Sequence, residues 1–580
     1  MDYTAPTAEQ LFALRICAGI EELAENDRFA AASADVVDAI VAGIGDFAAS
    51  EWAPLNRIGD TQGARLTPDG VVLPEGFAEA YRAYVEAGWN TIAAPEQFGG
   101  QALPFSLAVC VLENLGTANL AFSLLPMLTV GAIEALLHHG SEAQKTLYLP
   151  KLVSGEWSGT MNLTEPRAGS DVGALRTTAT PIAQGPDAGK YRISGSKIFI
   201  TWGEHGLCDN IIHLVLARTP GAPAGSRGIS LFVVPRYHVH HNATTCPPND
   251  LKATGLEHKL GIHASPTCVM SYGDRGECIG EIVGAENDGL RAMFTMMNSA
   301  RINVGAQGVM IAERATQQAM AYARDRVQSA RAGAADKSPV AIVEHPDVRR
   351  MLLRMRSLTE AARGLLYYAC GQIDRAALGD ERARVRAELL VPLVKAWCTD
   401  IGCEVASLGI QVHGGVGFIE ETGAAQYLRD ARIAPIYEGT NGIQAADFVS
   451  RKLGLDGGEA FAALLDDIAG DAGDACPLAD LSRSCKRIVL WMRGDASLDD
   501  RLAGSVPFLA MCAAAVAGWQ LLRQSRAALA QDAPPGLARS KPVTARYFLD
   551  HVVPEALGLE ASARAGANLL YELDADELAG

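Results

Sequence analysis

The sequence predicts a mainly α-helical protein with a β-barrel domain in its middle and an additional helical bundle at its C-terminal end. Apolar residues recur at intervals of three and four up to about residue 157, short β-rich runs replace them as far as residue 284, and the helical spacing then returns. The domains that we expect are an N-terminal extension (1–40), a helical domain (41–157), a β-barrel domain (158–284), a four-helix bundle (285–455) and a C-terminal helical domain (456–580).

The composition is that of a soluble globular protein, with 49% hydrophobic and 20% charged residues among 580. A net charge of -17 without a dense Lys/Arg face argues against nucleic-acid binding. The N-terminal MDYTAPTAEQLF has neither a basic nor an apolar signal region, so we expect a cytoplasmic protein. The twelve cysteines are scattered without a CxxC pair, which is typical of reduced thiols and indicates neither a disulfide framework nor a metal site.

The expected β-barrel rests on three runs, which read KYRISGSKIFI, NIIHLVLA and GISLFVVP and are separated by Gly/Pro turns. No long helical pattern lies between them. A small antiparallel barrel or sandwich is therefore expected, rather than βαβ units.

The clearest helix covers residues 390–412, where seven apolar residues from Leu390 to Val412 share one face. It should end near His413, because Gly414 and Gly415 follow. We expect the Gly/Asp-rich stretch 454–477 to be loose and about four alanine-rich helices to follow it. The apolar window 506–522 is at the short limit for a membrane span, so a buried bundle helix is expected and no stable membrane insertion.

The stretch IYEGTNGIQ (436–444) places Glu438 between an apolar pair and a glycine, just before a helix expected to begin near Asn441. Apolar neighbours would raise the pKa of this carboxyl and make it a stronger base. Alternatively, Glu438 is a first-turn glutamate that the helix macrodipole stabilises. The isolated motif favours the structural alternative, since structural acids are far commoner than catalytic ones.

The stretch QVHGGVG (411–417) resembles a dinucleotide fingerprint, but a long helix precedes its glycines where that motif requires a strand. A helix end followed by a glycine turn nevertheless lets the backbone approach a phosphate closely. His413 is expected to form a helix-end hydrogen bond rather than to bind a metal.

Five stretches occur in the order seen in one known family: LTEPRAGSD (163–171), GSKIFITWGEH (195–205), YARDRVQ (322–328), QVHGGVGFIEE (411–421) and IYEGTNGIQ. On these, the chain resembles the flavin-dependent acyl-CoA dehydrogenases over residues 40–455. The opening segment and the extra C-terminal bundle are similar to the long subgroup, which includes methylthiopropanoyl-CoA dehydrogenases and broad-range bacterial fatty acyl-CoA dehydrogenases.

The resemblance implies α,β-dehydrogenation of an acyl-CoA to the trans-2-enoyl-CoA, with Glu438 as the base, hydride transfer to N5 of FAD and electrons passed to electron-transfer flavoprotein. It also implies a homodimer or homotetramer. Some relatives carry the base just before an arginine that matches Arg301, but Ala300 stands there in this chain. Glu438 is therefore the remaining candidate.

The resemblance further implies site residues. The expected cofactor contacts are Leu163, Thr164, Ser170, Phe199, Thr201, Arg326, Gln328, Gln411, Gly414, Gly415, Thr440 and Gln444. The expected contacts to the acyl-CoA are Ser170, Asn298, Arg301, Tyr437 and Gly439. Phe199 would cover one flavin face, and it could equally belong to the barrel core, since the two roles are not exclusive. Arg326 would reach the diphosphate or pair with Asp325 on an exposed helix face. The role of Trp202 is open.

Two other functions use the same sequence features. A flavin oxidase or monooxygenase could share this fold, although the intact YEGT counts against it. A non-catalytic, flavin-containing assembly protein would use the C-terminal bundle as an interaction module.

Overall fold

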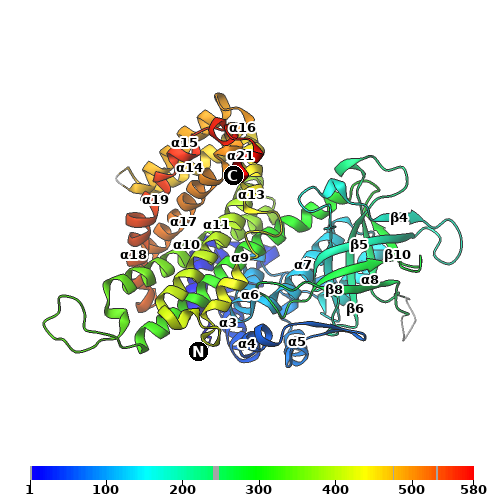
Figure 1. Ribbon diagram of the computed structural model, residues 1–580, viewed down its shortest axis with the longest axis horizontal. Coiled ribbons are helices and arrows are strands. Elements are labelled where there is room, and N and C mark those ends of the chain that lie inside the picture. Colours follow the sequence, from blue (N-terminus) through cyan, green and yellow to red (C-terminus); the bar gives the residue numbers. More distant parts are fainter. Residues whose placement is uncertain (1–2, 240–246, 475, 531–532) are drawn as a thin grey trace. The chain divides into compact units, whose positions relative to one another are not determined.

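The computed structural model describes residues 3–239, 247–474, 476–530 and 533–580 (Figure 1). The chain forms two compact units. The β-containing unit comprises Asp46–Leu103 and Ala118–Ala300, and the helical unit comprises Met1–Gly45, Pro104–Thr117 and Arg301–Gly580.

The β-containing unit is built on a sheet of eight strands. In spatial order these are β3 (Trp157–Asn162), β6 (Asn210–Ala217), β7 (Ser230–Pro235), β10 (Ile279–Val283), β5 (Tyr191–Thr201), β9 (Thr267–Tyr272) and β8 (Leu251–Leu256), with β4 (Thr178–Pro181) paired to β5. The strands predicted from the three β-rich runs are confirmed as β5, β6 and β7.

One strand pair departs from the expected antiparallel arrangement. β3 runs parallel to β6, with Trp157 opposite Asn210 and Asn162 opposite Val215, whereas the other pairs of this sheet are antiparallel. A parallel pair needs a long crossover connection, and residues 163–209 supply one. The expectation of a wholly antiparallel sheet was therefore wrong at β3.

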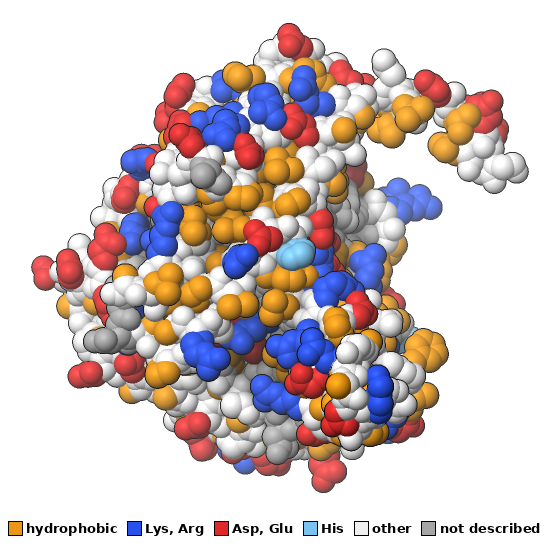
Figure 2. Space-filling view, turned by 90° about the vertical axis from the view of Figure 1, so that its left-hand side faces the viewer, with side chains coloured by type: hydrophobic (Ala, Val, Ile, Leu, Met, Phe, Trp, Pro, Cys, Tyr) orange, Lys and Arg blue, Asp and Glu red, His pale blue; other side chains and the backbone are white. Residues whose placement is uncertain are grey.

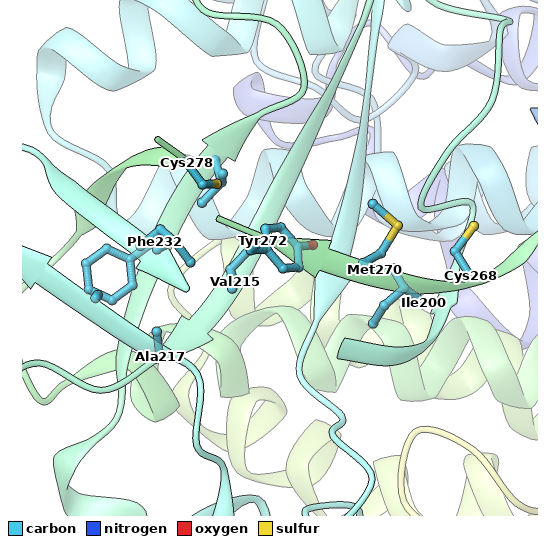
Figure 3. Packing of buried hydrophobic residues seen from close by; sticks show 11 residues of the cluster. Ile200, Val215, Ala217, Phe232, Cys268, Met270, Tyr272 and Cys278 are labelled. Atoms are coloured by element: carbon cyan, nitrogen blue, oxygen red, sulfur yellow. The ribbon is translucent and has the colours of Figure 1, made fainter. Parts of the chain in front are cut away.

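The core of this sheet is formed by side chains that alternate along the strands. On β9, Cys268, Met270 and Tyr272 are spaced by two and lie on one face, together with Val215 of β6 and Phe232 of β7 (Figure 3). The period of two thus produces one continuous apolar layer inside the unit.

Helices complete the β-containing unit. They are η3 (Ala48–Trp52), α4 (Ala53–Gln62), α5 (Phe77–Glu86), α7 (Leu120–His139), α8 (Glu142–Val153) and the start of α9 (Gly289–Asp325), with a small hairpin of β1 (Arg65–Thr67) and β2 (Gly70–Val72). α7 lies against β3 at Gly159, where an added Cβ would come within 2.3 Å of Ala132. Trp202 belongs to this core, since it is fully buried and its indole N–H donates to the Ala121 carbonyl at 3.3 Å.

The helical unit centres on two long helices that lie side by side, α10 (Pro346–Ala377) and α11 (Glu381–His413) (Figure 1). α11 ends at His413, as predicted. The later part of α9, α6 (Phe105–Ala118), α12 (Ala424–Ala431) and α13 (Asn441–Ser450) pack with them in this unit.

The C-terminal helices are α14 (Glu459–Ala472), α15 (Pro477–Gly494), α16 (Leu498–Ala503), α17 (Ser505–Ala530), α18 (Pro535–Tyr547), α19 (Val553–Gly558), α20 (Glu560–Ala563) and α21 (Ala575–Ala579). The expectation that residues 454–477 are loose was wrong for α14. Its apolar residues Phe461, Leu464, Leu465 and Ile468 follow helical spacing and are all buried, which outweighs its glycine and aspartate content.

Two described helices, α7 and α17, are long and apolar enough to cross a membrane. Most of each apolar window is buried inside the protein, 83% for α7 and 78% for α17, as expected for core helices. The prediction that residues 506–522 form a buried bundle helix is confirmed. On the face that Figure 2 shows, basic and acidic side chains are interspersed rather than gathered into one basic stripe.

A buried ion cluster joins the two ends of the chain within the helical unit. Lys541 of α18 contacts Glu9 of α1 (Thr7–Ala13), and its ammonium donates to Glu360 of α10 at 3.2 Å. Burial raises the pKa of the Glu360 carboxyl, but the charges of Lys541 and Arg356 outweigh this effect and hold the pKa below its ordinary value.

We expect this cluster to make folding acid-sensitive. A lowered pKa contributes stability that is present above the ordinary carboxyl pKa and is lost as the pH falls through the folded value. Glu360→Gln should therefore cost about 2 kcal/mol near pH 7, and its urea midpoint should converge with that of the wild type in acid. Glu572→Gln, which changes an exposed glutamate, is the matched control. Parallel midpoints at every pH would contradict the assignment.

Candidate functional site

Glu438 lies in a turn whose backbone conformation is unusual. The chain leaves α12 at Ala431 and enters α13 at Asn441, and the Thr440 hydroxyl caps α13 by accepting from the Ile443 N–H at 3.2 Å. Glu438 has φ +55° and Gly439 has φ +85°. A left-handed conformation costs a residue with a Cβ about 1 kcal/mol, and such strained residues cluster at functional sites.

This geometry excludes the first-turn interpretation of Glu438. Thr440 is the cap, so Glu438 precedes the helix by three positions and is not a first-turn residue of α13. The expectation that the macrodipole explains this glutamate was wrong. The half-buried side chain belongs to the connecting turn.

The charge environment of Glu438 suits a base. Burial raises the pKa of the Glu438 carboxyl, while the positive charges of Arg301 and Lys395 oppose the rise. Among the described residues, neither carboxylate oxygen nor the backbone N–H of Glu438 has a hydrogen-bond partner. A carboxylate with open oxygens and a raised pKa can take a proton from a bound molecule.

Two predicted neighbours lie at the same turn. The Tyr437 hydroxyl donates to the Gln307 side-chain oxygen on α9. Arg301, also on α9, is only 8% exposed, and its Nε has no partner among the described residues. An added Cβ at Gly439 would lie 3.9 Å from the Arg301 guanidinium. Arg301 is thus a buried cation beside the turn, and its Nε–H remains available to donate a hydrogen bond.

Lys395 was missed by the sequence analysis. It lies on α11, is fully buried, and its ammonium donates to the Asn441 side-chain oxygen at 2.9 Å. Burial lowers the pKa of the Lys395 ammonium to about 8, against the charges of Glu438 and Asp400. The available signal was a lysine inside the apolar run LLVPLVKAW.

The glycine turn after α11 is open. Gly414 has φ +64°, and nothing lies within 4 Å of a Cβ added at Gly414 or Gly415. Gln411, in the last turn of α11, is exposed. Gln444 is buried, and its Oε1 has no partner among the described residues. His413 Nδ1 is bonded to the Gly409 carbonyl at 2.6 Å, which confirms its predicted helix-end role.

Arg326 and Gln328 lie just beyond the end of α9. The Arg326 guanidinium donates to the Gln328 side-chain oxygen at 3.2 Å. In the described part of the chain no ion pair joins Arg326 to Asp325, so the expected helix-face pair was wrong. Arg326 follows the last helical residue, which leaves the two side chains bonded to each other on an exposed segment.

In the β-containing unit, a buried ion pair anchors the turn after β3. The Lys197 ammonium donates to the Glu165 carboxylate at 2.8 Å and to the Leu163 carbonyl at 3.0 Å. The Glu165 carboxylate also accepts from the Thr177 hydroxyl at 2.6 Å. These bonds hold the backbone of the turn that carries the half-buried Leu163 and Thr164.

Phe199 is 57% exposed, so the alternative that it belongs to the barrel core was wrong. The register of β5 against β9 shifts between Lys197 and Ile200, and Phe199 has φ +60° there. This bulge turns the ring outward. Thr201 is half-buried near the bulge, whereas Ser170 and Asn298 are exposed.

Family models match nearly the whole chain. They are described as the N-terminal (37–156), middle (160–274) and C-terminal (287–453) domains of acyl-CoA dehydrogenase, followed by an acetyl-CoA dehydrogenase C-terminal-like domain (460–574).

Two similar proteins cover this chain almost end to end. The 3-methylmercaptopropionyl-CoA dehydrogenase of Ruegeria pomeroyi is 47% identical, over 96% of this chain and 97% of its own length. The broad-specificity linear acyl-CoA dehydrogenase FadE5 of Mycobacterium tuberculosis is 32% identical, over 99% of both.

Solved structures share the fold. An acyl-CoA dehydrogenase from Bacillus anthracis, complexed with FAD, has a TM-score of 0.74 at 21% identity and covers 94% of this chain and 90% of its own. Butyryl-CoA dehydrogenase from Megasphaera elsdenii has a TM-score of 0.58 at 26% identity and covers 71% of this chain and 97% of its own.

Proposed function

Because this chain belongs to the acyl-CoA dehydrogenase family, we propose that it uses FAD to oxidise a saturated acyl-CoA to the trans-2-enoyl-CoA, with Glu438 as the base. The observation that carries the proposal is the strained turn of Glu438, whose carboxylate has a raised pKa and open oxygens beside a buried cation.

The residues of each unit fit the cofactor. The orphaned Oε1 of Gln444 can accept from an amino or hydroxyl group of the adenosine, and the open backbone at Gly414 and Gly415 leaves space for close approach of a phosphate. In the β-containing unit, Phe199 offers an outward-facing aromatic ring suited to a flat apolar surface. FAD, when bound, supplies the acceptor for the hydride of the substrate β-carbon. The remaining proposed contacts are Leu163, Thr164, Ser170, Thr201, Arg326, Gln328, Gln411 and Thr440.

This chain's own residues handle the proton and the thioester. The Cα–H bond breaks as the Glu438 carboxylate takes the proton, and the electron pair of that bond forms the new C=C bond while hydride leaves Cβ. The unpaired backbone N–H of Glu438 donates to the thioester carbonyl and stabilises the charge that develops there. Arg301 holds the anionic CoA portion, with Tyr437, Gly439, Ser170 and Asn298 as further contacts.

Anaerobic titration of the FAD-loaded protein with acyl-CoA tests the proposal. The yellow flavin absorption should bleach on substrate addition and stay bleached until electron-transfer flavoprotein is supplied. Rapid return of the colour in air would instead indicate an oxidase. No spectral change with any thioester would favour the assembly protein.

The substrate is proposed from the two relatives that cover this chain almost end to end. A thioether acyl-CoA such as 3-methylmercaptopropionyl-CoA follows from the 47% identical relative, and straight-chain acyl-CoAs follow from the broad-specificity one. Initial rates across chains of about four to sixteen carbons, with the thioether included, will rank them, because a hydrophobic pocket discriminates by volume.

Gly415→Leu tests the cofactor assignment. Since nothing lies near a Cβ at Gly415, the larger side chain should be tolerated by the fold but should occupy the space proposed for FAD. We expect FAD affinity to fall about tenfold or more, measured by flavin content after dialysis and by fluorescence titration. Gly454→Leu, at another glycine with an open Cβ direction, is the control. Unchanged FAD affinity in Gly415→Leu would contradict the assignment.

A further inference from the structure

Asn441 connects the turn that contains Glu438 to α11, through its backbone N–H and its side-chain amide. The Asn441 backbone N–H donates to the Pro435 carbonyl at 3.0 Å and closes the turn. The Asn441 amide nitrogen donates to Thr399 Oγ1 at 3.0 Å and to Asp400 Oδ1 at 2.8 Å, both on α11. Glu438 and Gly439, the two residues in the left-handed region, lie inside the closed segment.

The acceptor atom of Asn441 is bound from the same helix by Lys395, at 2.9 Å. The Lys395 ammonium is fully buried, and this is its one hydrogen bond among the described residues. Burying an ammonium with so few partners is costly, and a methionine would fill the same space without that cost. The charge therefore needs an explanation other than packing.

We propose that Lys395 and Asn441 are positioning residues for the base, Asn441 by holding the left-handed turn against α11 and Lys395 by keeping a second positive charge near the Glu438 carboxylate. This inference rests on the proposed function, and it goes beyond it by assigning roles to two residues outside the cofactor and substrate contacts.

The charges around the turn come from each element that packs there. Arg301 extends from α9, and Lys395 and Asp400 lie on α11. Asp447 lies on α13, Arg451 just after it, and Arg432 just after α12. Lys395 and Arg301 both oppose the rise that burial causes in the pKa of Glu438.

The sign of the effect follows from these charges. Without Lys395, the pKa of the Glu438 carboxyl rises further, so the acidic limb of the rate profile should move to higher pH. Because burial lowers the pKa of Lys395 to about 8, the wild-type ammonium loses its proton above that pH. The charge-dependent difference between variant and wild type should therefore shrink in alkaline solution.

Lys395→Met, Lys395→Gln and Asn441→Ala separate charge from geometry. The measurements are FAD content, the rate of anaerobic flavin reduction at saturating acyl-CoA, and the pH profile of that rate. FAD-loaded Lys395→Met should react about tenfold more slowly near neutral pH, with its acidic limb shifted upward. Lys395→Gln keeps a neutral donor to Asn441. Its flavin-reduction rate should therefore approach that of the wild type in alkaline solution, while its acidic limb stays shifted to higher pH. Asn441→Ala should reduce flavin slowly, but with its acidic limb at the wild-type pH.

Lys452→Met is the matched control, since Lys452 is a mostly buried lysine that pairs with Glu388. It should keep the wild-type rate and profile. If both Lys395 variants hold FAD and show the wild-type rate and profile, the inference is overturned, and so it is if they lose only thermal stability. If Lys395→Met fails to fold, Lys395→Gln decides. Full flavin reduction by Glu438→Gln would overturn the proposed function instead.

Discussion

Glu438→Gln should bind FAD and acyl-CoA normally yet reduce the flavin at least about a thousandfold more slowly than the wild type. The amide has nearly the shape of the carboxylate but cannot accept the α-proton. Stopped-flow measurement of flavin bleaching under anaerobic conditions, with rates expressed per bound flavin, gives this comparison directly. Retained flavin with lost reduction separates a chemical role from a structural one.

A second glutamate controls for the alternative interpretation of this position. Glu459 is an exposed acid in the first turn of α14, which is the role that the isolated motif suggested for Glu438. Glu459→Gln should reduce flavin at the wild-type rate. If Glu438→Gln behaved like Glu459→Gln, the assignment of the base would be refuted.

Arg363→Met should destabilise the helical unit by about 3–5 kcal/mol, because it leaves buried carboxylates without their counter-charge. Arg363 of α10 donates to Glu113 of α6 at 2.9 Å and to Glu313 of α9 at 2.7 Å. Glu113 is fully buried and also accepts from the Tyr367 hydroxyl at 2.6 Å. The measurement is the urea midpoint of helical circular dichroism.

Removing both charges tests the cause. The double variant Arg363→Met with Glu113→Gln should recover part of the lost stability, since one uncompensated carboxylate is removed with the cation. Arg384→Met is the control, because the Arg384 pairs with Glu381 and Glu388 are exposed or partly so and should contribute little. Additive losses in the double variant would show that packing, rather than charge, sets the cost.

Local sequence patterns were sufficient to predict the end of the long helix α11 and the residues of strand β6. The end of α11 at His413 followed from the glycines after it, and β6 matched its predicted residues. By contrast, α14 was missed because its glycine and aspartate content indicated a loop, while its four apolar residues needed a partner surface to become a buried face. The parallel β3–β6 pair was missed because strand direction depends on the path of the connection.

The sequence by itself determined the family, the order of the helical and β-rich parts, and the acid at position 438, because these follow from short motifs and from periodicity along the chain. The tertiary structure alone decided that Glu438 lies in a left-handed turn before the cap of α13, that Phe199 turns outward at a bulge, and that Lys395 lies buried near Glu438. Each of these features depends on residues far apart in sequence, such as Asn441 and Lys395 of α11. The cost of burying the Lys395 charge, and the effect of burial on the pKa of its ammonium, arise only when the folded chain brings these residues together.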